Sequence, residues 1–277
     1  MNAGASMASI SWRNPHRRCR FAEAALLLAV LGACPLRAHA QDRHYLGVAS
    51  AENGSAVRYR EEHWLFRADG VATRLVLYRC PSGEPFARKL VYERGDPAAP
   101  DFDFEDGRDG YREGVRREGE RWLVYARERG DAPMQTRLLQ AVPDMVVDAG
   151  FDAYVREHWA SLAGAARRDI AFVMPSRQDY LRLRLGDARD AWLDGVAVRR
   201  FRLGLGGLLG ALAPAIDLTY TMDGHLLRFE GIGTIRDERG RHAWVRIDFP
   251  RSLERAAPQP GEVAAARTVS LVTRCGA

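Results

Sequence analysis

The sequence predicts a mainly β protein in which one strongly curved antiparallel meander forms an open half-barrel. Short segments rich in β-branched and aromatic residues follow one another, and turn dipeptides such as Asp69-Gly70 and Asp223-Gly224 separate them. Only residues 148–163 have the period of an amphipathic helix. A sheet of about ten strands must curl or split to bury its apolar face, and one or two helices are enough to cover the concave side.

The strands are predicted from alternation and from turn signals. Residues 180–185 show the clearest alternation, because Leu181, Leu183 and Leu185 lie on one face and arginines lie on the other. This period of two is typical of a strand with a single buried face. The expected strands are 55–66, 73–79, 86–93, 121–127, 134–142, 170–174, 180–185, 196–203, 216–222, 226–235 and 243–249.

Two connecting segments stand out by their composition. Residues 96–109 are rich in proline, glycine and acidic residues, which predicts a long loop. Within it, the alternation of Phe102 and Phe104 indicates a strand end whose acids face water. A calcium site of the EF-hand type does not fit this loop, because the glycine arrives one place late at Gly107 and Arg112 occupies the position of the final glutamate. Residues 255–262 contain two prolines and a glycine and are expected to run over the surface.

Two segments predict helices that cover the concave face. In residues 148–163, Asp148 can cap the N-terminus, an apolar stripe faces the sheet, and Gly164 can end the helix. The stripe consists of Phe151, Val155, Trp159 and Leu162. Residues 206–213 predict a short apolar second helix without a polar face. Its large side chains are Leu208, Leu209 and Leu212, and Leu205 directly precedes the segment.

Residues 1–40 have the features of a cleavable export signal. The basic region contains Arg13, Arg17, Arg18 and Arg20. The apolar stretch Ala24–Ala33 is about ten residues long, which is too short for the ~20 residues that span a bilayer. The A-x-A pattern of residues 38–40 predicts cleavage between Ala40 and Gln41. The mature chain is then a single β-rich domain of residues 41–277 in the periplasm, without a transmembrane segment.

A lipid-anchored protein is the alternative to a soluble periplasmic one. Leu31-Gly32-Ala33-Cys34 resembles a lipobox, in which Cys34 is acylated and becomes the mature N-terminus. Gly32 and the following Pro35 fit that pattern poorly, whereas a complete A-x-A site lies just downstream.

The charge of the mature chain excludes an electrostatic footprint for nucleic acid. Removal of residues 1–40 takes away five arginines and one glutamate, which leaves 36 basic and 35 acidic side chains out of 41 and 36. Because the arginines alternate with apolar residues, no basic patch forms. Lys89 is the sole lysine of the chain.

Two cysteines remain after the signal is removed. Cys80 and Cys275 are expected to form a disulfide, because a lone pair of cysteines usually bridges in an oxidising compartment. The rival interpretation is a redox-active or nucleophilic thiol, which lacks the support of a C-x-x-C motif or of an adjacent helix start.

No familiar catalytic or metal-binding pattern occurs in the mature chain. None of its five histidines belongs to an H-x-x-H, H-E-x-x-H or H-x-H pattern, so no metal site is expected. His158 borders the apolar stripe, where packing is favoured over catalysis. A G-x-S-x-G elbow is missing, and residues 204–210 have the spacing G-x-G-x-x-x-G instead of a dinucleotide fingerprint. The sequence therefore predicts a protein that is not an enzyme and that needs no cofactor.

Three segments resemble a family of uncharacterised exported proteins of proteobacteria. They are Val147–Val155 (VDAGFDAYV), Leu226–Ile232 (LLRFEGI) and Tyr78–Lys89 (YRCPSGEPFARK). The resemblance covers most of the mature chain, and it implies no catalytic role for these residues. In fold, the meander with covering helices is similar to the open half-barrels of periplasmic lipoprotein carriers such as LolA and LolB. That similarity implies a concave face that cradles acyl chains under a helical lid, although fold alone does not fix function.

Two functions remain open at this point. In the first, the half-barrel binds an apolar ligand such as a lipid or an acyl chain. The candidate ligand-binding residues are Phe151, Val155, Trp159, Leu208, Leu209 and Leu212. In the second, the protein is a structural or assembly factor of the cell envelope whose concave face is filled by its own side chains. An empty apolar cavity would favour binding, and a packed concave face would favour the structural role.

Overall fold

The computed structural model describes residues 42–276, apart from residues 53, 55, 165, 207–214 and 238. The described residues lie in one compact unit. Several sequence-based predictions fall outside them: the signal of residues 1–40 with its cleavage site, the alternative anchor at Cys34, and the apolar helix after Gly206.

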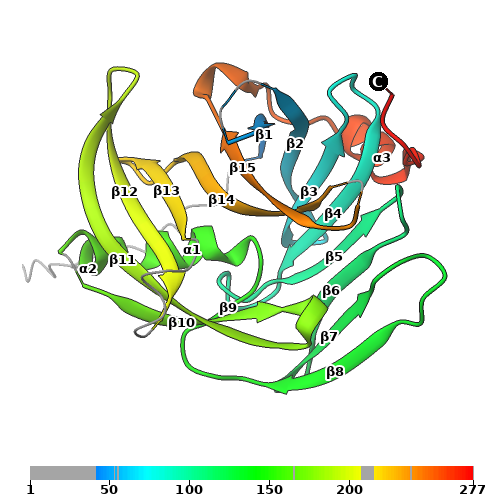
Figure 1. Ribbon diagram of the computed structural model, residues 1–277, viewed down its shortest axis with the longest axis horizontal. Helices are drawn as coiled ribbons and strands as arrows, with labels where there is room; N and C mark the ends of the chain where they lie inside the picture. The colour runs from blue at the N-terminus through cyan, green and yellow to red at the C-terminus, as the bar shows by residue number, and fades with distance from the viewer. Residues whose placement is uncertain are drawn as a thin grey trace, which may run out of the picture. The chain divides into compact units, whose positions relative to one another are not determined.

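A single curved, unclosed sheet forms the protein, and two meanders meet in its middle (Figure 1). Strand β1 pairs with β15, so that β1–β8 extend to one side and β15–β9 to the other, which leaves β8 and β9 at the edges. All neighbouring strands are antiparallel except β9 and β10, which pair in parallel. The first meander contains β1 (Arg43–Ser50), β2 (Val57–Ala68), β3 (Val71–Arg79), β4 (Pro85–Glu93), β5 (Asp101–Asp106), β6 (Arg112–Glu118), β7 (Arg121–Arg127) and β8 (Gln135–Gln140). The second contains β9 (Met145–Val146), β10 (Arg168–Met174), β11 (Asp179–Leu193), β12 (Val196–Leu205), β13 (Ile216–Thr221), β14 (Leu226–Arg236) and β15 (His242–Asp248), while β16 (Glu254–Arg255) pairs with β1.

This architecture confirms the predicted curved antiparallel meander, but the expected loop at residues 96–109 is wrong in its second half. Strand β5 occupies Asp101–Asp106, because Phe102 and Phe104 pack on the inner face between β4 and β6. Its acids are also not all turned to water, since Asp106 is buried and accepts hydrogen bonds from the Arg108 guanidinium. The Arg108 guanidinium therefore compensates the burial of this one carboxylate.

The predicted helix of residues 148–163 is divided in two. Helix α1 covers Gly150–Glu157 and α2 covers Trp159–Ala163, with His158 at the break and Gly164 as the predicted C-cap. The expected N-cap role of Asp148 is wrong: Ala149 is the N-cap residue, and the Asp148 carboxylate bonds to Lys89 instead. Figure 1 shows α1 inside the curve of the sheet.

The segment of residues 255–262 is exposed apart from Pro258, as expected, and it leads into a third helix that was not expected from the sequence. Helix α3 covers Pro260–Thr268 and begins with a capping box between Gln259 and Glu262. It packs on the outer face of β2 and β3. This outer cluster consists of Trp64, Leu75, Leu77, Val263 and Ala266.

The predicted disulfide is confirmed. Cys80 and Cys275 are joined, with 5.5 Å between their Cα atoms, and the bond closes a sequence separation of 195 residues. It attaches the C-terminal segment to the start of the turn between β3 and β4. Among the described helices, none combines the length and the apolar character needed to cross a membrane.

Candidate functional site

The concave face contains the three predicted ligand-binding residues that the structure describes. Val155 is fully buried, whereas Phe151 and Trp159 are partly buried. The Trp159 ring packs edge to face on β12 and β13, with its centroid 5.3 Å from that of Phe201 and 5.9 Å from that of Tyr220. Leu208, Leu209 and Leu212 lie outside the described residues. Side chains of α1 and α2 therefore pack against the concave side of the second meander.

A buried ion pair joins the start of α1 to the first meander. The Lys89 Nζ atom on β4 lies 2.6 Å from Asp148 Oδ1, and the two side chains are 7% and 9% exposed. The rings of Tyr78, Phe102 and Phe104 surround the ammonium, with centroids 5.6–6.0 Å away. Asp148 has a left-handed backbone conformation with φ 42°. Sequence reasoning missed this pair, although a sole lysine among so many arginines was a signal.

More polar groups lie beside this pair in the interior. The pKa of the Arg74 guanidinium on β3 is raised, since burial lowers it but nearby negative charges, including those of Asp152 and Asp148, raise it by more. Several buried atoms have no hydrogen-bond partner among the described residues, and they include Asp148 Oδ2, Asp152 Oδ1, Arg74 Nε and Tyr220 Oη. Burial raises the pKa of the Tyr220 phenol well above its usual value, so the group stays neutral. Buried atoms of this kind are usually satisfied by ordered water, which makes the centre of the molecule polar.

A histidine and a glutamate form a second buried pair on β2. His63 Nε2 lies 2.9 Å from Glu61 Oε2, and the His63 ring stacks on Tyr45 with the ring centroids 4.6 Å apart. Burial lowers the pKa of His63, which favours the neutral imidazole. The other ring nitrogen, Nδ1, is buried and has no partner in the described part of the chain. The pair therefore has a base but no hydroxyl or thiol bonded to it, as nucleophilic catalysis would require.

Strand β14 is connected to the loops of the first meander by an arginine. The Arg236 guanidinium lies over the Tyr111 ring, 3.8 Å from its centroid, and forms a 2.8 Å bond to Glu128. Tyr111 donates a hydrogen bond to Glu113, whose pKa is raised by burial. These contacts tie β14 to the turns beside β5 and β7.

His158 lies between α1 and α2, with its Nε2 atom 4.0 Å from Asp144 Oδ1. The His158 ring lies edge to face on Tyr154, with the centroids 4.3 Å apart. Tyr154 donates a hydrogen bond to Asp144, which Arg168 also contacts at 2.7 Å. These bonds, from Tyr154 first and then from Arg168, lower the pKa of Asp144. Across the described ranges, no group of three or more histidine, cysteine, aspartate and glutamate residues is placed to hold a metal ion.

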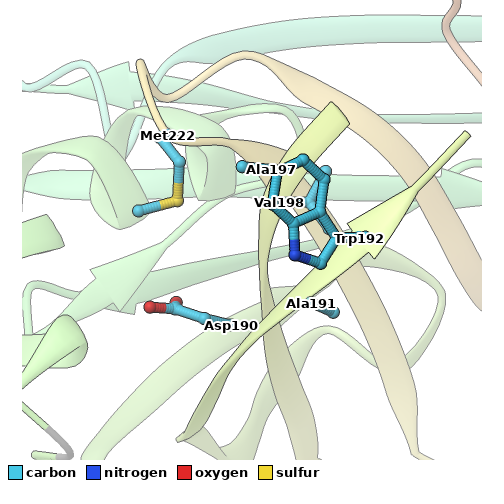
Figure 2. A pocket seen from close by; sticks show the side chains of 6 residues that line it. All are labelled: Asp190, Ala191, Trp192, Ala197, Val198 and Met222. Atoms are coloured by element: carbon cyan, nitrogen blue, oxygen red, sulfur yellow. The ribbon is translucent and has the colours of Figure 1, made fainter. Parts of the chain in front are cut away.

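Two pockets flank the end of the β11–β12 hairpin, outside the packed interior. The first has a volume of about 290 Å³, and Figure 2 shows Trp192, Met222 and Asp190 around it, with the backbone of β12 behind. The second has a volume of about 380 Å³ and is lined by Leu193, Val196 and other residues of β13–β15. Both volumes are at or near the lower end of the range for small-molecule sites.

The fold and these sites define a class: a β half-barrel with a filled concave face, ion pairs in its interior and an apolar hairpin end. No protein-family model matches the chain, and no curated protein matches it. Among solved structures, a beta-barrel-like protein of the domain of unknown function DUF1849 from Brucella abortus is similar. The two chains are 10% identical and superpose with a TM-score of 0.46, over 76% of this chain and 94% of that chain. The resemblance to an exported proteobacterial family stays a prediction.

Proposed function

We propose that the protein is exported to the cell envelope and acts there without catalysis, as a structural or assembly factor. The observation that carries this proposal is the filled concave face. Val155 and Leu162 of the two short helices are fully buried, and Trp159 packs on Phe201 and Tyr220. A carrier of the half-barrel type needs this face to receive its ligand, whereas here α1 occupies it.

Export is supported by the disulfide and by the signal-like sequence of residues 1–40. A Cys80–Cys275 bond is typical of an oxidising compartment. N-terminal sequencing of the protein from a periplasmic extract tests the address, and we expect Gln41 as the first residue. An acylated Cys34 would instead assign a lipid-anchored protein, and retention of residues 1–40 would contradict export.

The absence of catalysis is supported by how the interior ionisable groups are used. Lys89 binds Asp148, His63 binds Glu61, and Arg236 binds Glu128. Each of these groups is engaged by a partner of opposite charge or by a hydrogen-bond partner. None of the three pairs contains a serine, threonine or cysteine side chain that the partner could activate as a nucleophile.

An apolar ligand in the half-barrel is the second candidate function. The observation that favours it is the incomplete cover of Phe151 and Trp159, which are only partly buried within the described part of the chain. An acyl chain laid against these rings would gain about 0.8 kcal/mol for each buried methylene group before ordering costs.

One experiment separates the two candidates. Protein from a periplasmic extract is examined by native mass spectrometry and by titration with an apolar fluorophore. We expect the mass of the unliganded chain and no saturable fluorophore binding. Copurified acyl species, together with probe binding that Trp159→Ala abolishes and Ile232→Ala preserves, would support the ligand-binding candidate instead; Ile232 is an exposed apolar control on β14.

A further inference from the structure

The end of the β11–β12 hairpin is the most exposed apolar feature among the described residues. Trp192 is 74% exposed, the largest value for any large apolar side chain in the described ranges. Met222, which lines the same pocket, is 46% exposed, and Val196 on the opposite face of the hairpin is 45% exposed. Strand β13 pairs with β12 only as far as Val198 and Thr221, so the end of the hairpin extends past its neighbour (Figure 1).

The turn of this hairpin is tight and holds Trp192 outward. Asp194 and Gly195 have φ angles of 49° and 80°, which match the two-residue turn that joins twisted strands. Trp192 therefore lies within the paired part of β11, opposite Ala197 and one residue before the last pair of the hairpin. Its exposure thus follows from the pairing of the two strands.

Two arginines without acidic partners lie three strand positions further from the turn than the exposed tryptophan, on the opposite face of the hairpin. Arg189 and Arg200 face each other across the β11–β12 register, and both are exposed. Neither forms an ion pair within the described residues, whereas Arg199 on the same hairpin binds Asp190 at 2.6 Å. Like charges directly opposite each other destabilise a strand pair, and an oxyanion between the two guanidinium groups would remove this repulsion.

The acidic groups of the hairpin do not cancel this pair. Asp190 is engaged by Arg199, and Asp187 is engaged by Arg167 at 2.6 Å. Within residues 187–200 only the Asp194 carboxylate at the turn has no ion-pair partner among the described residues, so two such guanidinium groups face one such carboxylate. A symmetric dimer formed through this surface would place the arginine pairs of the two copies near each other, and their repulsion would disfavour the dimer.

We propose that the hairpin end docks on an anionic phospholipid surface, with Trp192 in the interface and lipid phosphates bound by Arg189 and Arg200. Tryptophan is enriched at membrane interfaces, because its ring is apolar and its N–H group remains wet. Guanidinium groups bind phosphate through paired hydrogen bonds, and each basic residue near such a surface strengthens the attraction. This inference rests on the proposed envelope location and adds the surface to which the protein attaches.

Vesicle cosedimentation tests the proposal with purified mature protein. Phosphatidylcholine vesicles are compared with vesicles that also contain phosphatidylglycerol. We expect binding to the anionic vesicles, which added salt weakens. Arg189→Gln combined with Arg200→Gln should lower this binding at least about tenfold, and Trp192→Ala should weaken it as well.

Matched variants control for general effects of charge and apolar area. Arg121→Gln on β7 removes an exposed arginine from another hairpin, and Ile232→Ala removes an exposed apolar side chain from β14. Both should bind vesicles like the unmodified protein. Equal binding to both vesicle types, no binding, or equal loss in the control variants would overturn the proposal.

Self-association gives a further way to contradict it. If the protein dimerises and Trp192→Ala abolishes the dimer without changing vesicle binding, the hairpin end is an interface between copies. Vesicle binding is measured on purified protein and is independent of the N-terminus and of any cargo. Its failure is therefore distinguishable from failure of the proposed function.

Discussion

Lys89 and Asp148, which are 59 residues apart in the sequence, form a buried ion pair with 2.6 Å between Nζ and Oδ1. The pair connects β4 of the first meander with the residue that leads into α1. Three aromatic rings enclose the ammonium, so water does not share in its solvation from that side. This contact fixes the position of the helix that fills the concave face.

Removing one member of this pair should be strongly destabilising. Lys89→Met leaves the Asp148 carboxylate buried without a counter-charge, which we expect to cost about 3–5 kcal/mol in the free energy of unfolding. Urea denaturation measures the change. The double variant with Asp148→Asn should recover much of the loss, because asparagine tolerates the left-handed conformation and carries no charge. Arg184→Met, which breaks an exposed pair with Asp169, serves as the control and should leave the midpoint unchanged.

Trp159→Ala tests how far the concave face is packed. The ring contacts Phe201 and Tyr220, and its truncation should cost about 3–5 kcal/mol of unfolding free energy. Trp192→Ala makes the same substitution at a 74% exposed position and should change stability by less than about 0.5 kcal/mol. Similar small effects of both variants, measured by urea denaturation, would show that Trp159 is not part of the core.

Loss of the disulfide should weaken the fold through the unfolded state. In the chain-entropy description, a loop of this length contributes about 4–5 kcal/mol, and less if the native bond is strained. The comparison is between the oxidised protein and the variant with Cys80→Ala and Cys275→Ala, in urea. Thiol titration of the mature protein denatured without reductant should find no free thiol. Two free thiols would contradict the bond.

Buried His63 should make stability depend on pH. Its folded-state pKa lies below the ordinary value of 6.5 because burial disfavours the charged imidazole, so the unfolded chain takes up the proton more readily. This contribution to stability is fully present above the unfolded-state pKa of about 6.5, and it is lost as the pH falls below that value through the lowered folded-state pKa. Glu61, Tyr45, Arg74 and Lys89 act on the same ring and set the size of the effect.

The variant His63→Gln isolates this contribution. Its unfolding free energy should fall less between the same two pH values than that of the unmodified protein. His225→Gln is the comparison, because burial also lowers the pKa of His225 and a part of the slope belongs to that residue. An unchanged slope in His63→Gln would refute the assignment.

The sequence predicted most of the strands and the disulfide, whereas β1, β5 and β6 were not among the predicted ranges. The alternation in residues 180–185 predicted one buried face, and Leu183 and Leu185 are buried while Arg182 and Arg184 are exposed. Such a pattern is local, because side chains alternate along any strand. The disulfide was predictable for a different reason, since only two cysteines remain outside the export signal.

Only the tertiary structure decided which distant residues meet. The acidic segment of residues 101–106 became β5 because guanidinium groups and backbone N–H groups from elsewhere satisfy its carboxylates, as Arg117 N does for Asp101. Asp148, which was predicted to cap the helix, instead binds Lys89, a residue that is distant in the sequence. Local periodicity fixes the type of an element and its buried face, whereas these contacts depend on how the sheet curves and on the register of strands that are far apart in the chain.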